Sequence, residues 1–310
     1  MSPRVVLLGP PSSTDALSAT LADVAPTGPV AIIRAGWQEM EAESGSLADA
    51  LGPRAVPLAL HARTERVWSE DPDLMAAHRA LQQNARVLRR AYNIRLSSTM
   101  GAWAALGRQE GPDHLLGPER TATLETVREL DERQRRRIGE IRAEFTASTR
   151  PGTRPAVQRE RAEIEGLLDG VGTVVLDGGH VAVLLNRIRL FGVDALLAKR
   201  TTVGISGGAM VLTDRLVLFH DTPPWGPGHA EVAESGLGLA PGLVVLPHAA
   251  RRLQLTDPLR VGRLARRFAP AECIALDDGA RLDFDGTSWH AGSARRLTAA
   301  GEVIDRDAAA

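Results

Sequence analysis

The sequence predicts an α/β protein of three layers, in which helices cover both faces of a mostly parallel sheet. Short apolar runs bounded by Gly, Pro or Asp recur along the chain, a pattern typical of buried strands. Helical patterns separate several of these runs, and strands that alternate with helices favour a parallel sheet. Residues 63–165 carry helical patterns without such runs and predict a helical insertion into this domain.

The strands are expected, in chain order, at residues 5–8, 30–33, 55–60, 173–176, 202–205, 216–219, 243–246, 273–276 and 281–284. Apolar residues at helical spacing predict helices at 17–24, 181–191 and 259–268, each suited to lie on a sheet. Residues 1–62 and 166–297 are therefore expected to form one α/β domain, followed by a loosely held tail at 298–310.

The insertion is expected to contain three helices. Asp71 and Pro72 are a typical helix start, with Asp as the N-cap and Pro at the first helical position. A second helix is predicted at 121–145 and a third at 157–168, joined by a linker at 146–155 that is rich in Thr and Pro. The block is a helical cap with a solvated charged face, or else a lid or a dimer surface.

Composition excludes several classes of protein. The chain has 310 residues, 44% of them hydrophobic, with 37 Lys and Arg against 38 Asp and Glu. This balance argues against a general nucleic-acid or membrane-surface binder, since no excess positive field attracts phosphates. The single cysteine, Cys273, excludes an internal disulfide or a multi-cysteine metal site and is expected in the core. No apolar run approaches the roughly 20 residues of a membrane span or resembles a signal peptide, so a cytoplasmic protein is expected.

The most informative motif is Gly-Ile-Ser-Gly-Gly at residues 204–208, between a predicted strand and a helical pattern. A serine at such a sharp turn has its hydroxyl held clear of the sheet, near the positive end of the following helix. The motif predicts Ser206 as a nucleophile, and the alternative is an ordinary structural turn.

A serine nucleophile needs a base and an oriented partner. His248 follows the strand at 243–246, and Asp277 and Asp278 follow the strand at 273–276. The carboxyl ends of parallel strands share one edge of a sheet, so Ser206, His248 and one of the two aspartates can converge there. The backbone N–H groups of Gly207 and of the Gly178-Gly179 turn are candidate oxyanion donors.

The order serine, histidine, acid disfavours an α/β-hydrolase esterase, in which the acid precedes the histidine. That reading requires Asp214 or Asp221 as the acid.

These segments resemble the peptidase S51 family, which contains cyanophycinase and aspartyl dipeptidase. The resemblance rests on Asp177-Gly178-Gly179, on residues 204–209, on Gly238-Leu239-Ala240-Pro241-Gly242 leading to His248, and on Ala275-Leu276-Asp277-Asp278. It covers residues 171–296 and, more weakly, the first 60.

The resemblance implies a class I glutamine amidotransferase-like, flavodoxin-like fold. It also implies Ser206 as nucleophile, His248 as base, Asp278 as acid, and Gly179 and Gly207 as oxyanion donors. The implied activity is hydrolysis of a peptide or isopeptide bond next to aspartate through an acyl-enzyme, without a metal or cofactor. His180-Val181 stands where cyanophycinases typically have Asp-Gln, which does not favour cyanophycin as the substrate.

Several other residues are candidates for substrate contact. Gly178, His180 and Trp225 are expected near the substrate, and His180 alternatively caps a helix. Arg187 and Arg189 either pair with a substrate carboxylate or lie on a solvated helix face. His220, Asp221 and His229 flank a loop rich in Pro and Gly, but their spacing matches no metal pattern.

Two functions remain in competition. The first is a serine hydrolase acting on a small peptide. The second is a non-catalytic amidotransferase-like module whose helical insertion binds a partner. The insertion is also a candidate surface for homo-oligomerisation.

Overall fold

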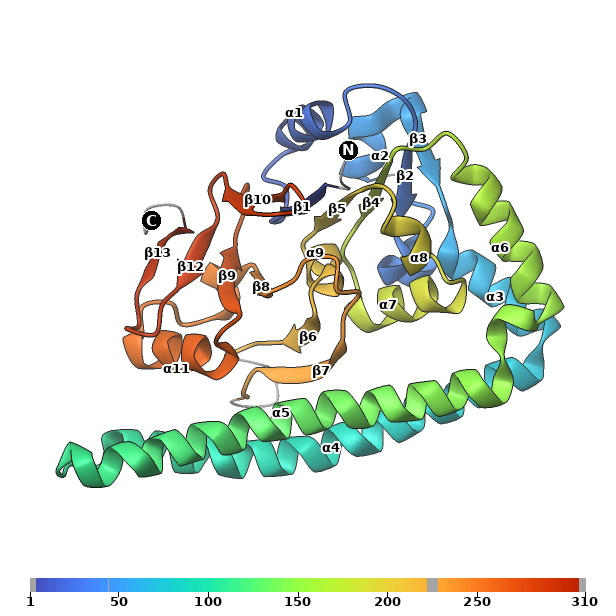
Figure 1. The fold of residues 1–310 in the computed structure, drawn as a ribbon. Coiled ribbons are helices and arrows are strands. Elements are labelled where there is room, and N and C mark those ends of the chain that lie inside the picture. The colour runs from blue at the N-terminus through green and yellow to red at the C-terminus, as the bar shows by residue number, and fades with distance from the viewer. Residues whose placement is uncertain (1–3, 44, 222–227, 307–310) are drawn as a thin grey trace.

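The computed structural model describes residues 4–43, 45–221 and 228–306, and it confirms a three-layer α/β fold with a largely parallel sheet (Figure 1). The strands are β1 (Val5–Leu8), β2 (Val30–Ile33), β3 (Ala55–Pro57), β4 (Thr173–Leu176), β5 (Thr201–Ile205), β6 (Arg215–Leu218), β7 (Glu231–Ser235), β8 (Leu243–Pro247), β9 (Glu272–Leu276), β10 (Arg281–Phe284), β11 (Trp289–Ala291), β12 (Arg295–Leu297) and β13 (Val303–Asp305). The helices are α1 (Thr14–Val24), α2 (Ser46–Leu51), α3 (Leu60–Glu70), α4 (Pro72–Arg108), α5 (Asp113–Thr149), α6 (Pro155–Leu167), α7 (Val181–Leu190), α8 (Asp194–Leu197), α9 (Gly207–Leu212), α10 (Ala249–Arg252) and α11 (Pro258–Phe268). Short 3₁₀ helices are η1 (Ala35–Met40), η2 (Gly52–Arg54) and η3 (Pro151–Thr153).

The main sheet has seven strands in the order β11-β10-β1-β5-β4-β2-β3. The five from β1 to β3 run parallel, and β10 and β11 add an antiparallel edge. α1 and α2 cover one face, where Leu17, Leu21 and Leu47 pack on Val175 and Val203. Helices α3, α6, α7 and α9 contribute to the larger core on the other face. Both faces are covered, and the central strands are mostly apolar and buried, as the sequence predicts.

The strands that precede Ser206, His248 and the two aspartates were expected to end at one edge of a single sheet, but they belong to two sheets. β8 and β9 are parallel to each other, but they belong to a four-stranded sheet in the order β13-β12-β9-β8. β6 and β7 form a separate antiparallel ribbon. Strands β7, β11, β12 and β13 were not predicted because they are short and alternate or mix polar with apolar residues. The predicted tail at 298–310 contains β13, which pairs with β12.

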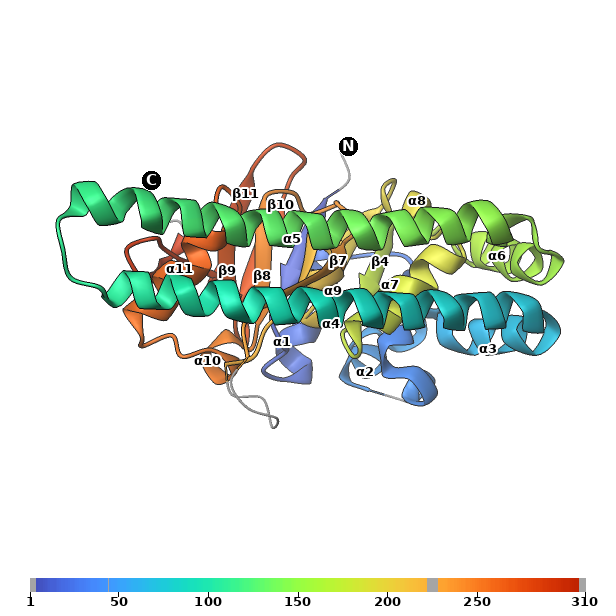
Figure 2. The same ribbon diagram turned by 90° about the horizontal axis from the view of Figure 1, so that it is seen from below.

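The helical insertion is dominated by a hairpin of α4 and α5, each 37 residues long. At 1.5 Å per residue each helix extends about 55 Å, and the hairpin runs along the whole underside of the α/β domain (Figure 2). Asp71 caps α4 as predicted, and its side chain accepts the N–H of Leu74 at 2.9 Å. α5 begins earlier and ends later than the predicted 121–145. Its first turns lie at the hairpin tip, where Arg120 donates to the carbonyls of Leu106 and Gln109 that end α4.

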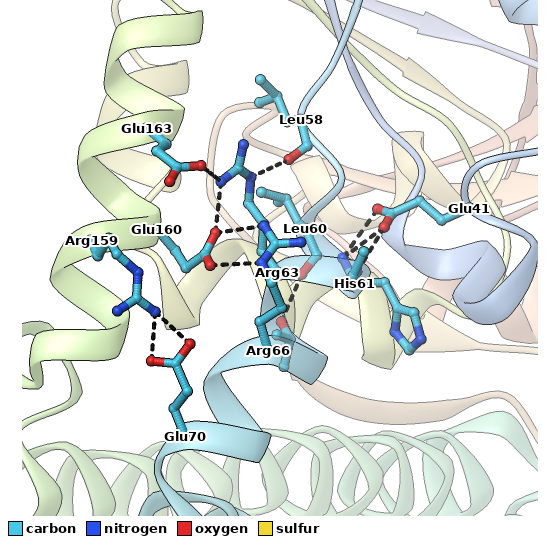
Figure 3. A network of polar contacts seen from close by, with 12 residues as sticks. Glu41, Leu58, Leu60, His61, Arg63, Arg66, Glu70, Arg159, Glu160 and Glu163 are labelled. Atoms are coloured by element: carbon cyan, nitrogen blue, oxygen red, sulfur yellow. Dashed lines mark hydrogen bonds and ion pairs between the residues drawn. The ribbon is translucent and has the colours of Figure 1, made fainter.

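The root of the hairpin is an ion-pair network between α3, where the chain leaves the domain, and α6, where it returns (Figure 3). Glu160 is 2% exposed and accepts from Arg63 at 2.7 Å and from Arg66 at 2.8 Å. The hydrogen bond from Arg66 is the main reason that the pKa of Glu160 lies below its usual value. Nearby, Glu41 accepts the N–H groups of His61 and Ala62 at the start of α3.

A second buried network fixes the middle of the hairpin to the domain. Arg267 of α11 forms two hydrogen bonds to Asp131 of α5, at 2.7 and 2.6 Å. Tyr92 of α4 donates to Asp131 at 2.7 Å and accepts the N–H of Val232 in β7 at 3.1 Å. The network joins four elements, so the hairpin is held along its length as well as at its root. Within the described ranges, no helix is both long and apolar enough to cross a bilayer.

Candidate active site

Ser206 lies on a strained turn between β5 and α9. Its backbone has φ 51° and ψ −112°, a region that side-chain-bearing residues rarely adopt and that costs about 1–3 kcal/mol. The flanking glycines are sterically required. A Cβ on Gly208 would lie 2.0 Å from the carbonyl oxygen of Leu176, and one on Gly204 would lie 2.7 Å from the Cα of Ala209. The turn therefore holds the serine at the carboxyl end of β5 with its side chain half-buried.

His248 reaches Ser206 from the other sheet. It follows β8 in the left-handed conformation, with φ 56° and ψ 36°, and its N–H donates to the carbonyl of Leu276 in β9. Its Nε2 lies 3.5 Å from the Oγ of Ser206. This distance is the outer limit of a hydrogen bond, and such contacts are often long before a substrate is bound. The structure thus brings the predicted nucleophile and base together.

The two aspartates after β9 differ in their contacts. Asp277 accepts the N–H of Ala250 and a hydrogen bond from Arg295, each at 2.8 Å. Asp278 is exposed, and neither carboxylate is hydrogen-bonded to His248 within the residues that the structure describes. Both nevertheless raise the pKa of His248, and Asp278 does so more strongly than Asp277. The structure brings the acid near the histidine without a direct contact.

The Gly178-Gly179 turn packs directly against the serine turn. A Cβ on Gly178 would lie 3.2 Å from the nitrogen of Gly207, and Gly179 has φ 78°. In the described part of the chain, the N–H groups of Gly179 and Gly207 have no protein acceptor. Two free donors beside a serine hydroxyl can stabilise an oxyanion.

Three residues that the sequence reasoning missed hold this turn in place. Asp177 accepts from the side chains of Arg34 at 3.1 Å and Trp37 at 2.9 Å. The carbonyl of Gly36 accepts the N–H of His180 at 2.7 Å, and a Cβ on Gly36 would lie 2.2 Å from the Gly178 carbonyl oxygen. All three residues follow β2, which pairs in parallel with β4. Their position after a parallel strand was the sequence signal that could have placed them at this edge of the sheet.

Other predicted contacts have different outcomes. His180 is exposed and caps α7, with Nδ1 accepting the N–H of Val183 at 3.4 Å. Arg189 is bound to buried Glu234 of β7, and Arg187 lies 3.7 Å from Glu65 and over the ring of Trp68. Both arginines therefore face protein glutamates, and the alternative that placed them on a solvated helix face is wrong. Trp225 lies outside the described residues.

A cleft of about 470 Å³ opens beside His248 and is lined by His220, His248, Arg251 and Arg252. Arg252 lies over the ring of Phe219, and burial lowers its pKa. Within the described ranges neither Arg251 nor Arg252 has a carboxylate at ion-pair distance. Burial and the charge of Arg252 also lower the pKa of His248. The cleft is therefore cationic and keeps the imidazole neutral near pH 7.

Metal ligands, the single cysteine and the aspartates of the esterase reading are the other groups with possible chemistry. Among the described residues, no three or more His, Cys, Asp or Glu side chains are arranged to hold a metal ion. Cys273 is 1% exposed, and burial raises its pKa to about 12, which agrees with its predicted place in the core. Asp214 accepts the N–H of Gly242, and Asp221 pairs with Arg260. Both carboxylates that an esterase reading required are thus bound to groups other than His248.

No protein-family model matches the chain, and no curated protein matches it significantly. Among solved structures, it is similar to a peptidase from an acI-B1 Actinobacterium, with 13% identity and a TM-score of 0.43 over 98% of this chain and 97% of that one. It is also similar to a candidate Peptidase E protein from Listeria monocytogenes EGD-e, with 11% identity and a TM-score of 0.43 over 96% and 100% of the two chains.

Proposed function

We propose that the protein is a serine hydrolase of the peptidase S51 type, which cleaves a peptide or isopeptide bond next to aspartate. One observation carries the proposal. A serine held at positive φ after a parallel strand lies 3.5 Å from a histidine Nε2, beside two backbone N–H groups that have no acceptor among the described residues. A serine with a strained backbone at such a turn is typical of nucleophiles. In an ordinary turn, a glycine would adopt the same conformation without the cost in free energy.

The chemistry proceeds through an acyl-enzyme. The Oγ of Ser206 attacks the scissile carbonyl carbon while His248 Nε2 accepts its proton. The N–H groups of Gly179 and Gly207 bind the oxyanion. The C–N bond then breaks, and His248 gives its proton to the leaving amine. Water attacks the acyl group, His248 takes the water's proton, and that proton returns to Ser206 as the acid product leaves.

Asp278 is the proposed partner of His248. Asp277 is already bound to Arg295 and to the N–H of Ala250, whereas Asp278 is free of such contacts in the described part of the chain. Asp278 also has the larger effect on the pKa of His248. Its negative charge would stabilise the imidazolium that forms when Ser206 attacks.

The preference for an acidic substrate rests on Arg251 and Arg252. They line the cleft next to His248 and lack a protein carboxylate within the described ranges. A guanidinium binds a carboxylate through two parallel hydrogen bonds, so a substrate aspartate would neutralise this positive wall. The chemistry of the wall fits an aspartyl side chain better than an apolar one.

A fluorophosphonate probe and intact-mass spectrometry test the nucleophile. The wild-type protein should gain one probe adduct at Ser206, and Ser206→Ala should gain none. Hydrolysis of Asp-X and β-Asp-X peptides, with Asn-X peptides as the matched control, tests the substrate class. Absence of labelling in a folded sample, together with absence of hydrolysis, would favour the non-catalytic binding module instead.

A further inference from the structure

A cavity of about 290 Å³ lies where the tip half of α4 passes the α/β domain. Met100, Ala104 and Arg108 of α4 form one wall. α11 forms another wall, and the segments after β6 and after α10 complete the cavity. In the view of Figure 2, α11 lies on one side of α4 and α10 on the other. The hairpin therefore completes a space that the α/β domain alone would leave open.

The inner surface of the cavity is mainly apolar. Phe219, Leu253, Leu255, Leu264 and Leu297 line it. Small-molecule sites are typically apolar cavities of roughly 300–1,000 Å³ with a few convergent polar groups. The size is suited to one apolar side chain with a short polar attachment.

The charged groups at the cavity are unevenly balanced. Arg260 lies 3.3 Å from Asp221 and 3.5 Å from Asp257, and Arg267 is bound to Asp131. Arg108 and Arg263 have no carboxylate at ion-pair distance in the described part of the chain. Burial, and next the charge of Arg108, lower the pKa of Arg263. The charge of Asp257 partly offsets that of Arg263, and the remaining positive potential of the two guanidinium groups favours an anionic ligand.

The cavity adjoins the cleft of the Ser206–His248 dyad. His220 lines both spaces. Arg251 and Arg252 line the cleft, and the next residues in the chain, Leu253 and Leu255 among them, line the cavity. A short chain that begins at Ser206 and continues past His220 would therefore enter the apolar space beneath the hairpin.

We propose that this cavity binds the apolar C-terminal residue of a short peptide, with the free carboxylate held by Arg108 and Arg263. The apolar lining fits the side chain, and the two arginines, which have no ion-pair partner among the described residues, fit the carboxylate. The identity of this peptide as a substrate rests on the proposed hydrolase function. Its binding does not, because the cavity contains neither Ser206 nor His248.

Calorimetric titration of the full-length Ser206→Ala protein with N-acetyl-alanyl-leucine tests the site without turnover. The peptide should bind, and its C-terminal amide should bind at least about tenfold more weakly, since a neutral amide loses the charge-assisted hydrogen bonds. Arg263→Met should reduce binding of the carboxylate to the level of the amide. Equal affinity for acid and amide, or no binding to the folded protein, would overturn the proposal.

Two tryptophan substitutions on α4 locate the ligand. Ala104→Trp fills the cavity and should abolish binding, whereas Ala102→Trp places the same side chain on the exposed face and should leave binding unchanged. Circular dichroism verifies that both variants are folded. Unchanged binding in Ala104→Trp would contradict the proposed location.

Labelling by the fluorophosphonate separates this inference from the proposed function. Ala104→Trp placed in the otherwise wild-type chain should still be labelled at Ser206. Peptide binding without labelling of the wild type would leave the cavity assigned and remove the hydrolase. Labelling of Ser206 without peptide binding would support the hydrolase and overturn the proposed role of the cavity.

Discussion

The Oγ of Ser206 and the Nε2 of His248 lie 3.5 Å apart although their strands belong to different sheets. Each residue directly follows its strand and adopts positive φ, which turns its side chain away from the sheet. The contact therefore depends on how the four-stranded sheet packs against the seven-stranded one. A small change in that packing would separate the two side chains.

Backbone strain at Ser206 predicts that a substitution which relieves the strain stabilises the fold while it removes the activity. Ser206→Gly should abolish hydrolysis and raise the free energy of unfolding by about 1 kcal/mol, because glycine adopts this conformation without strain. Urea denaturation measures the change. Ser206→Ala should abolish hydrolysis without this increase in the free energy of unfolding. A Gly variant that is no more stable than the Ala variant would contradict this account.

The pH dependence of kcat/KM should show an acid limb below the usual histidine value of 6.5. Burial and Arg252 disfavour the charged imidazole, so His248 stays neutral and competent as a base down to a pH lower than usual. Activity should be full at neutral pH and fall as the pH drops through the lowered pKa. Arg252→Met should move the limb to higher pH, and a limb that does not move would count against this electrostatic origin.

The two aspartates after β9 should separate in their kinetic roles. Asp278→Asn should lower kcat by roughly 10²–10⁴-fold, the range for loss of the acid partner of a catalytic histidine. It should also move the acid limb to lower pH, because a charge that raises the pKa of His248 is removed. Asp277→Asn should change kcat much less. The opposite ranking in steady-state kinetics would assign the acid to Asp277.

Glycine at position 208 is required by the close packing of α9 on β4. Gly208→Ala would place a Cβ 2.0 Å from the carbonyl oxygen of Leu176, which is backbone and has no room to move aside. The substitution should destabilise the fold by about 3 kcal/mol or more. Gly172→Ala is the matched control, since no atom lies within 4 Å of its Cβ position. Equal melting temperatures for the two variants would refute the steric argument.

The hairpin's buried ion pair should matter greatly for stability. Asp131→Ala leaves the guanidinium of Arg267, which is 2% exposed, without its carboxylate. Loss of one partner of a buried pair costs about 3–5 kcal/mol. Denaturant titration should show this loss, while Asp113→Ala at the exposed hairpin tip should change stability by less than about 1 kcal/mol. A small effect at Asp131 would mean that water reaches the network.

The sequence by itself was enough to predict the α/β class, the central strands and the Asp71 start of α4. These features are local, because apolar runs, glycine turns and capping residues determine them within a few residues. The turn at Ser206 and Gly207 was also predicted locally, since a tight turn needs small residues, and His248 was expected from its place after a strand. The catalytic roles of these residues stay predictions. Strands β7, β11, β12 and β13 were not predicted, because short strands of mixed polarity have no local signal distinct from loops.

Only the tertiary structure decided which distant groups meet. It divided the strands between two sheets, joined Asp177 to Arg34 and Trp37, and occupied Arg187 and Arg189 with glutamates. It also placed α4 over a cavity beside the dyad. These contacts join residues far apart in the chain, and their free energy depends on burial and distance in space, which a linear pattern of residue types does not encode.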